Sequence, residues 1–303
     1  MDSVVIVGAS GWATRAAEFV LTEKLSLESD LLKFYGSHPR AEEINCKKYN
    51  VKEWVPQKLK APTSLFLPLG FLTVDKYLKW GRQEFEDRNR QLIQKSVEFI
   101  KLNEPERCIL ISSGIVDKTL DLSPRKPSYL SYARLKSEEE DQIARICQET
   151  KTKIVICRLF SASGRHIVDP NRYALGNFVV QGILTGKIEV KSNGFVLRRY
   201  FDMGQLIEIC IKASEKEGLT RFDSGGELIE VTELAEKVAH HLGSKVSTRM
   251  EEPKYLMDSY FSKSSMMEDF AEELQIRPFS ISKQIEETII GVKFQLQKQG
   301  LFL

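Results

Sequence analysis

The chain has 303 residues, 42% of them hydrophobic, which is enough to bury a large core as one long domain or two unequal ones. Its 44 Lys and Arg nearly balance its 42 Asp and Glu, so we expect no concentrated basic surface and no nucleic-acid partner. Its five cysteines are scattered without a CxxC pair and no long apolar run follows the N-terminus, so we expect a cytoplasmic protein that does not enter a membrane.

Apolar runs and helical patterns alternate through the first half of the chain. Strands are predicted at residues 3–7, 30–35, 65–69, 108–111 and 154–159. Helices are predicted at residues 13–25, 84–102 and 132–149. This alternation predicts an α/β fold with a doubly wound parallel Rossmann sheet.

Beyond residue 165 the alternation weakens, and two helices stand out, at residues 231–242 and 280–297. Loops at residues 164–171 and 191–194 separate shorter elements. We therefore expect a smaller, mixed α/β region toward the C-terminus, with a boundary near residue 164.

The first predicted strand runs into the first helix through two glycines, Gly8 and Gly11. At such a turn the backbone approaches a pyrophosphate closely, and the free amides at the helix start hold the anion. The turn predicts dinucleotide binding by Gly8, Ser10, Gly11, Trp12 and Ala13. A plain strand-to-helix turn is the alternative. Thr14 stands where a third glycine or alanine is usual, which predicts looser packing of the helix on the strand.

The end of the second predicted strand bears on the choice between NAD and NADP. An enzyme that uses NAD usually has a carboxylate there, about 20 residues beyond the glycine turn, to bind a ribose hydroxyl. This chain has none at the strand tip, and Ser37, His38 and Arg40 are suited to a ribose phosphate. The pattern favours NADP, and the alternative is a solvated loop with an incidental arginine.

Tyr132 and Lys136 lie four residues apart in a predicted helix, so they share one helix face. A free tyrosine has a pKa of about 10, and each unit by which a cation lowers that pKa is about 1.4 kcal/mol in favour of the phenolate. Tyr132 is therefore predicted to exchange protons near neutral pH. Taken alone, such a pair is also typical of a solvated helix face, and Ser112 and Ser113 at a strand end are typical of simple capping.

The order and spacing of the glycine turn, the Ser112-Ser113 strand end and the Tyr132 to Lys136 pair resemble the extended short-chain dehydrogenase/reductase family of nucleotide-sugar epimerases, dehydratases and ketoreductases. Further segments similar to that family's motifs lie at residues 158–164, 175–178, 194–200 and 223–226. The resemblance covers nearly the whole chain. It implies a dinucleotide-binding Rossmann domain at residues 1–164 and a mainly substrate-binding region at residues 165–303, with some elements returning to the Rossmann sheet.

The resemblance also implies roles for single residues. Ser113 would hydrogen-bond the reacting sugar oxygen, Tyr132 would accept or donate its proton, and Lys136 would bind the nicotinamide ribose. Cofactor-binding residues would be Gly8, Ser10, Gly11, Trp12, Ala13, Ser37, His38, Arg40, Leu69, Gly70, Asn89, Tyr132, Lys136 and Phe160. Substrate-binding residues would be Ser113, Ser161, Asn177 and Arg198. Members often form homodimers through the helices expected here at residues 84–102 and 132–149.

Departures from the family's motifs narrow the expected chemistry. Sugar 4,6-dehydratases commonly place an Asp-Glu pair after the strand-end hydroxyl, whereas Gly114 and Ile115 follow Ser113 here, which disfavours dehydration. Ser161 and Gly204-Gln205 also replace residues usual at the sugar site, so the sequence does not name the sugar.

We therefore predict an NAD(P)-dependent ketoreductase or epimerase that acts on a nucleotide-activated sugar by hydride transfer. Tyr132 would be its acid and base, and it would need no metal. The alternative is a non-catalytic NAD(P)-binding sensor or scaffold, because a fold does not by itself confer a reaction.

Overall fold

The computed structural model describes residues 1, 3–117, 126–192, 195–248, 257–264 and 266–302. The chain divides into two compact units. The first contains Met1–Leu159 and Ile207–Phe222, and the second contains Phe160–Leu206 and Asp223–Leu303. Gly194, which belongs to one of the family-like segments, lies outside the described residues.

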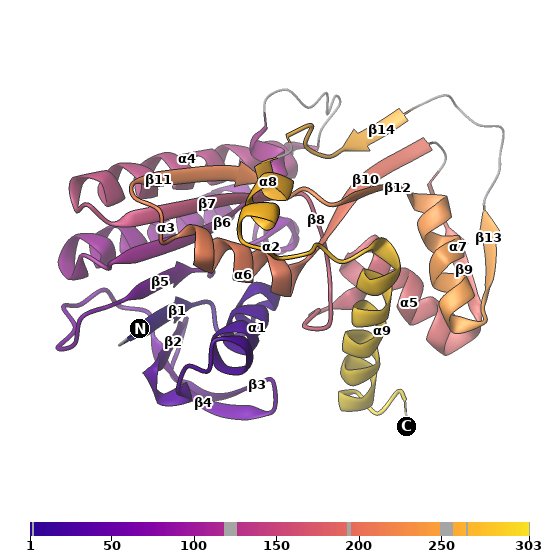
Figure 1. The fold of residues 1–303 in the computed structure, drawn as a ribbon, viewed down its shortest axis with the longest axis horizontal. Helices are drawn as coiled ribbons and strands as arrows, with labels where there is room; N and C mark the ends of the chain where they lie inside the picture. The colour runs from indigo at the N-terminus through magenta and orange to yellow at the C-terminus, as the bar shows by residue number, and fades with distance from the viewer. Residues whose placement is uncertain (2, 118–125, 193–194, 249–256, 265, 303) are drawn as a thin grey trace. The chain divides into compact units, whose positions relative to one another are not determined.

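The first unit is built on an eight-stranded sheet with the order β11-β7-β6-β5-β1-β2-β4-β3 (Figure 1). Its strands are β1 (Val4–Val7), β2 (Leu32–Gly36), β3 (Arg40–Ile44), β4 (Lys47–Glu53), β5 (Leu65–Pro68), β6 (Arg107–Ser113), β7 (Lys153–Leu159) and β11 (Leu219–Asp223). The six strands from β7 to β4 pair in parallel, and β3 runs antiparallel to β4. Every residue of β1 and β5 is buried, as their apolar sequences require of strands covered on both faces.

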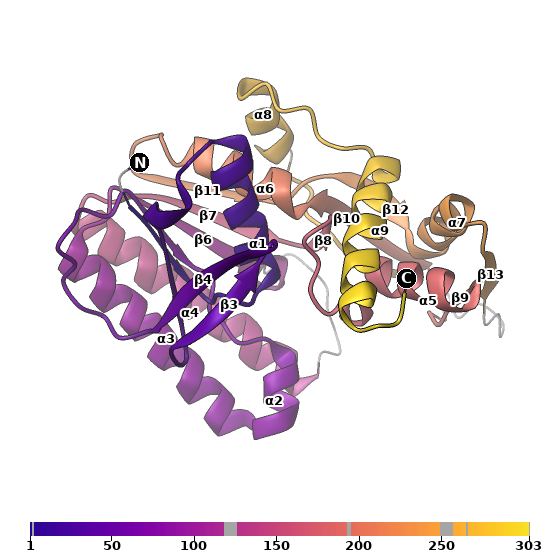
Figure 2. The same cartoon turned by 90° about the horizontal axis from the view of Figure 1, so that it is seen from below.

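Helices cover both faces of this sheet. They are α1 (Trp12–Phe19), which continues into a π-helical turn (Val20–Lys24), α3 (Arg82–Asn103), α4 (Pro127–Glu149) and α6 (Met203–Ala213), within which the chain passes from the second unit to the first. Helix α2 (Val74–Trp80) has no buried residue and packs on α3 and α4 instead of on the sheet. Figure 2 shows α3 and α4 side by side on one face and α1 on the other. The aromatic rings of Tyr35, Trp54, Phe66 and Phe99 pack together in the core on the α3 side.

These elements confirm the predicted doubly wound sheet, including all five predicted strands. The antiparallel hairpin of β3 and β4 was missed. Its turn consists of Asn45 and Cys46, both at positive φ, so the usual glycine signal of a tight turn is absent. A short 3-10 turn follows β6 at Gly114–Val116, and another precedes β2 at Ser29–Leu31.

The second unit contains two small sheets. One has the order β12-β10-β14, with β8 also paired to β10, and the other pairs β13 with β9. Their bounds are β8 (Ser161–Ser163), β9 (Lys187–Val190), β10 (Phe195–Asp202), β12 (Glu227–Glu230), β13 (Lys245–Thr248) and β14 (Met257–Tyr260). The helices are α5 (Ala174–Thr185), α7 (Val231–Leu242), α8 (Met266–Glu273) and α9 (Ile281–Lys298), with a 3-10 turn at Pro170–Arg172. The unit is smaller and mixed, as expected from the weaker alternation of the sequence.

Helix α9 packs against the loop that follows β8. Gln284 accepts a hydrogen bond from Ser163 at 2.6 Å, and the backbone amide of Gly164 donates to Thr288 at 2.9 Å. Gly291 faces the same loop, where a β-carbon would lie 2.2 Å from the carbonyl oxygen of Arg165. Only a glycine lets the helix approach so closely, which explains this glycine inside a long helix.

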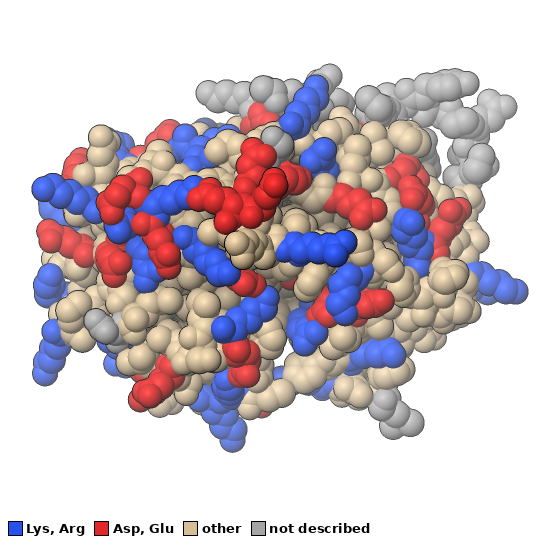
Figure 3. Space-filling view, in the orientation of Figure 1, with Lys and Arg blue, Asp and Glu red and all other residues tan. Residues whose placement is uncertain are grey.

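Surface charge carries both signs. On the face shown in Figure 3, Lys and Arg are interspersed with Asp and Glu, and a small acidic group lies over α8. Among the residues that the structure describes, none of the helices is both long and apolar enough to cross a membrane. Nor does the described part of the chain gather three or more His, Cys, Asp or Glu side chains in a metal-binding arrangement.

Candidate functional site

The glycine turn connects β1 to α1 and packs against the segment that follows the neighbouring strand β5. Gly8 has a φ of +96°, and its amide donates to the carbonyl of Tyr35 at 2.9 Å. A β-carbon on Gly8 would lie 2.7 Å from both the Cα of Gly70 and the carbonyl oxygen of Leu69. The turn therefore requires glycine for its backbone angle and for the contact with residues 69–70.

Gly11 has a different role in the turn. Its φ is −78°, and a β-carbon there would meet only ordinary contacts, the nearest 3.5 Å away at the carbonyl oxygen of Gly8. Nothing inside the described unit therefore demands glycine at this position. Within the described chain no side chain caps the start of α1, and a helix start of this kind suits an anion.

Thr14 and the neighbouring residues complete the turn. Thr14 is fully buried, and its hydroxyl donates to the carbonyl of Gly8 at 2.7 Å, so the looser packing expected there is not observed. Trp12 is buried, Ala13 is half-buried and Ser10 is exposed. Thr14 thus holds the carbonyl of Gly8 by a side-chain hydrogen bond, which the glycine or alanine usual at this position could not make.

The three residues expected to bind a ribose phosphate lie at the end of β2 and the start of β3. The hydroxyl of Ser37 and Nδ1 of His38 are 3.0 Å apart. The Arg40 guanidinium donates to Glu42 at 2.7 Å, and its Nη1 lies 2.9 Å from where a β-carbon of Gly36 would be. Arg40 therefore covers the tip of β2 but is already paired with a carboxylate.

The segment after β5 is fixed from both ends. The amide of Leu69 donates to Val7 at 2.9 Å, and Gly70 packs under Gly8. Asn89, which is fully buried in α3, accepts a hydrogen bond from the amide of Leu72 at 2.9 Å and donates to the Leu72 carbonyl at 3.4 Å. Asn89 therefore holds the loop that passes the glycine turn.

Ser113 ends β6 and caps the 3-10 turn that follows. Its hydroxyl accepts a hydrogen bond from the amide of Ile115 at 3.4 Å. Gly114 and Ile115 lie in that turn, which contacts α4. The capping role considered from the sequence is observed, and it places the Ser113 hydroxyl at the carboxyl edge of the sheet.

Tyr132 and Lys136 lie on α4 beside the end of β6. The Lys136 ammonium donates to the carbonyl of Ile111 in β6 at 3.1 Å. The ring of Phe71 is edge-on to Tyr132, with 5.7 Å between the centroids, and the Lys136 ammonium lies 4.0 Å from the centroid of Phe71. The structure thus brings the predicted pair to the carboxyl end of the sheet and adds Phe71, which sequence reasoning missed.

Glu139 was also missed. Its carboxylate lies 2.8 Å from the Lys136 ammonium, and both side chains are almost completely buried. Burial raises the pKa of the Glu139 carboxyl, although the neighbouring Lys136 acts in the opposite direction. The sequence did carry a signal, because Glu139 is three residues from Lys136 and such pairs share a helix face.

Glu140, the next residue, faces away from Lys136 and toward the strands. Arg158 of β7 binds its carboxylate with two nitrogens, at 2.9 and 2.8 Å, and Arg221 of β11 approaches it to 3.6 Å. This ion pair ties α4 to the sheet. It gives Arg158, known from the sequence only as part of a family-like segment, a structural role.

The remaining predicted site residues belong to the second unit. The amide of Phe160 donates to Ser224 at 3.0 Å, and its ring packs 5.0 Å from that of Tyr260. Ser161 is half-buried in β8, and Asn177 donates to Asn171 at 3.1 Å. These are the positions that the family resemblance associates with nicotinamide and substrate.

Arg198 was expected to bind a nucleotide diphosphate. In the structure its Nη2 lies 2.7 Å from Asp258 on the neighbouring strand β14. Arg199, which departs from the family motif, donates to Glu268 at 3.4 Å. A diphosphate that binds Arg198 would therefore have to compete with Asp258.

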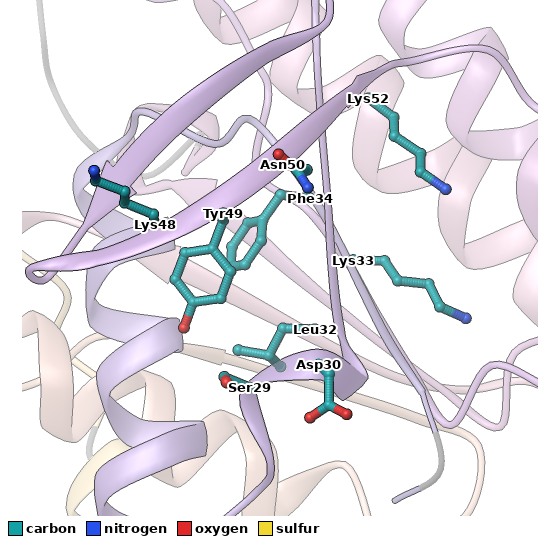
Figure 4. Close-up of a pocket in the computed structure, with 9 residues that line it drawn as sticks. All are labelled: Ser29, Asp30, Leu32, Lys33, Phe34, Lys48, Tyr49, Asn50 and Lys52. Carbon is teal, nitrogen blue, oxygen red and sulfur yellow. The ribbon is translucent and has the colours of Figure 1, made fainter.

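A hollow of about 320 Å³ lies elsewhere in the first unit (Figure 4). It is lined by Ser29, Asp30, Leu32, Lys33, Phe34, Lys48, Tyr49, Asn50 and Lys52. These residues come from the turn before β2, from the first half of β2 and from β4. Ligands of doubly wound sheets bind instead at the carboxyl ends of the strands. The hollow is therefore separate from the candidate site.

Comparison with solved structures identifies the fold. A UDP-N-acetylglucosamine 4-epimerase from Methanobrevibacter ruminantium, in complex with UDP-N-acetylmuramic acid, has 16% identity and a TM-score of 0.72 over 98% of this chain and 99% of its own. A UDP-glucose 4-epimerase from Brucella ovis, in complex with NAD, has 14% identity and a TM-score of 0.72 over 96% of this chain and 99% of its own. The chain has the fold of the extended short-chain dehydrogenases/reductases.

Dehydratases share this fold. An NAD-dependent NDP-hexosamine 5,6-dehydratase involved in tunicamycin biosynthesis has 13% identity and a TM-score of 0.68 over 95% of this chain and 96% of its own. Neither the protein-family models nor the curated proteins include a match to this sequence. In this fold the turn at Gly8 and Gly11, the Ser113 strand end and the Tyr132 to Lys136 pair lie along one edge of the sheet, where dinucleotides bind in doubly wound proteins.

Proposed function

We propose that the chain is an NAD(P)-dependent oxidoreductase that acts on a nucleotide-activated sugar, either an epimerase or a ketoreductase. The observation that carries this proposal is the arrangement at the carboxyl edge of the first unit's sheet. The glycine turn packs against Gly70 there, and the ammonium of Lys136 is bonded to the end of β6, beside Tyr132. An uncapped helix start and glycine backbone suit a pyrophosphate, and a phenol next to an ammonium suits proton exchange.

Three side chains would act on the sugar and the cofactor. The phenolic oxygen of Tyr132 would give its proton to, or take it from, the sugar oxygen as the carbon loses or gains hydride. Ser113 would hydrogen-bond that oxygen, and Lys136 would bind the nicotinamide ribose beside the phenol. A nicotinamide dinucleotide, when bound, supplies the hydride acceptor or donor.

We propose NAD as the cofactor in preference to NADP. The sequence favours NADP because the tip of β2 has no carboxylate and bears Ser37, His38 and Arg40. In the structure, however, Glu42 pairs with Arg40, and a 2′-phosphate would bring a second negative charge beside that carboxylate. The Brucella ovis epimerase contains NAD, which is consistent with this choice. A retained NAD would favour epimerisation, because that reaction returns the hydride to the same sugar.

Dehydration is less well supported. Gly114 and Ile115 form the turn after Ser113, and neither side chain can move a proton. A 4,6-dehydratase would need both an acid and a base there in addition to Tyr132.

A non-catalytic role is the second candidate, and one observation favours it. The Lys136 ammonium donates hydrogen bonds to Ile111 and Glu139 and contacts the ring of Phe71, so in the structure these three groups enclose it and a ligand does not reach it. A protein that binds a dinucleotide without reacting would tolerate that arrangement.

Activity assays separate the two candidates. Wild-type protein and Tyr132→Phe would be incubated with a panel of UDP- and dTDP-sugars and NAD to test epimerisation, and with UDP- and dTDP-linked keto sugars and NADH or NADPH to test reduction. Products would be followed by NMR and by absorbance at the nicotinamide band. We expect Tyr132→Phe to lose at least about 100-fold in kcat, because it removes the acid and base. Binding of NAD without turnover of any sugar would favour the non-catalytic candidate.

The homodimer implied by the resemblance is also a proposal. The outward faces of α3 and α4 carry ion pairs such as Arg88 with Glu84 and Arg134 with Glu138, so an interface there would be unusually polar. Light scattering at micromolar concentration tests the proposal, and a monomeric mass would contradict it.

A further inference from the structure

Lys136 is enclosed on three sides in the first unit. Its ammonium donates to the carbonyl of Ile111 at 3.1 Å and to Glu139 at 2.8 Å, and it faces the ring of Phe71 at 4.0 Å. Only 4% of the residue is exposed. A ribose hydroxyl can therefore reach the ammonium only if one of these three groups moves.

Two of the three groups are fixed. The Ile111 carbonyl belongs to the central strand β6, which pairs along its whole length with β7. Glu139 is buried on α4, and moving it would leave a buried ammonium without its counter-charge, which is costly. Phe71 is different, because it lies in the irregular segment between β5 and α2 and is only half-buried.

The backbone around Phe71 is nevertheless held in place. Gly70 is packed under Gly8, and both backbone groups of Leu72 are bonded to Asn89. The ring can thus leave the ammonium by rotating its side chain, without displacing the loop. Phe71 also contacts Tyr132 edge-on, so it covers the phenol and the ammonium together.

We propose that Phe71 is the gate of the candidate site: its ring covers Lys136, as the structure shows, and swings away when a dinucleotide ribose binds there. This inference rests on the proposed function, because it assumes that Lys136 binds the ribose. Glu139 stays paired throughout, so Lys136 offers the ribose a hydrogen bond while its charge remains compensated.

The test compares three variants with wild type. Phe71→Ala removes the ring, Phe71→Leu keeps apolar bulk without the π face, and Phe71→Tyr keeps the ring as the matched control. Affinities for NAD, NADH, NADP and NADPH would be measured by isothermal titration calorimetry. Exposure of Lys136 would be measured without ligand by competitive acetylation and mass spectrometry, relative to the exposed Lys58 of the same chain.

A gate predicts that Phe71→Ala binds the dinucleotide about tenfold more tightly than wild type, since binding no longer displaces a desolvated cation–π contact. Lys136 would be acetylated several times faster in Phe71→Ala, and Phe71→Tyr would match wild type in both measurements. Phe71→Leu, which preserves packing, is expected to lie between them and replaces Phe71→Ala if that variant does not fold.

Two results would overturn the proposal in different ways. If wild type binds NAD and Phe71→Ala binds it equally well or more weakly, the gate is wrong and the proposed function stands. If wild type, Phe71→Ala and Phe71→Leu all fail to bind NAD, NADH, NADP and NADPH, the proposed function fails and the gate fails with it.

Discussion

Replacing the two turn glycines one at a time separates the fold from the ligand. In Gly8→Ala the new β-carbon would lie 2.7 Å from backbone atoms of residues 69 and 70, at a φ of +96°. A positive φ costs a non-glycine residue about 1–2 kcal/mol, and forcing two strand ends apart adds a similar amount. We therefore expect Gly8→Ala to lower the free energy of unfolding by about 2–4 kcal/mol.

Gly11→Ala should behave differently. Its backbone angles suit alanine and its β-carbon meets only ordinary contacts, so the free energy of unfolding should change by about 0.5 kcal/mol or less. The added methyl would however stand where a pyrophosphate approaches the turn. A steric conflict of about 1–3 kcal/mol weakens dinucleotide binding about tenfold to a hundredfold.

Urea unfolding and titration with NAD and NADH measure both effects on the same samples. A Gly8→Ala variant as stable as wild type would refute the close contact of the two strand ends. A Gly11→Ala variant that binds NAD as tightly as wild type would refute the turn as the pyrophosphate site.

Two further predictions follow from the ion pairs. Glu42→Ala frees the Arg40 guanidinium, so the affinity for NADP relative to NAD should rise about tenfold in calorimetric titrations, and an unchanged ratio would show that Arg40 does not face the ribose. Glu86 is buried, and although burial alone raises its pKa, hydrogen bonds from arginines, above all Arg134, lower it to about 2. A carboxyl whose pKa is lower in the folded than in the unfolded protein stabilises the fold at pH values above its unfolded pKa of 4.5, and this stabilisation is lost as the pH falls toward 2. Glu86→Gln should therefore lower the free energy of unfolding by about 1–2 kcal/mol at pH 7 and by almost nothing near pH 2. Glu84→Gln, in an exposed pair, is the control and should change stability by less than about 0.5 kcal/mol, and an equal loss in both variants would contradict the reasoning.

Local pattern was sufficient to predict the Rossmann sheet. A parallel strand buried on both faces is a continuous apolar run, and β1 and β5 are such runs between turn residues. The β3 and β4 hairpin was not predictable in this way, because β3 is largely exposed and its turn lacks glycine. Its position at the sheet edge is decided by the parallel pairing of β4 with β2.

The candidate site was predictable only in part. The glycines and the Tyr132 to Lys136 pair are local motifs, and the structure brings them to one edge of the sheet. The partners of Lys136 depend on more than spacing. Three consecutive glutamates follow it, and only the rotation of α4 against the sheet decides that Glu139 faces Lys136 whereas Glu140 faces Arg158.

Contacts between residues far apart in the sequence account for the other omissions. Phe71 reaches Lys136 because β5 and β6 are neighbours in the sheet, and Asp258 reaches Arg198 because β14 pairs with β10. Neither contact has a sequence signature. Both contacts change the expected chemistry, because Lys136 and Arg198, which the motifs predict to bind a ligand, already contact another side chain of the protein.

Identification of the bound dinucleotide would test the proposed function. Purified wild type and Phe71→Ala would be denatured and any released nucleotide identified by mass spectrometry, and the same proteins would be titrated with NAD, NADH, NADP and NADPH. We expect NAD or NADH to be released or bound, with tighter binding by Phe71→Ala. If neither protein releases or binds any of the four, the glycine turn is not a dinucleotide site and the proposed function is wrong.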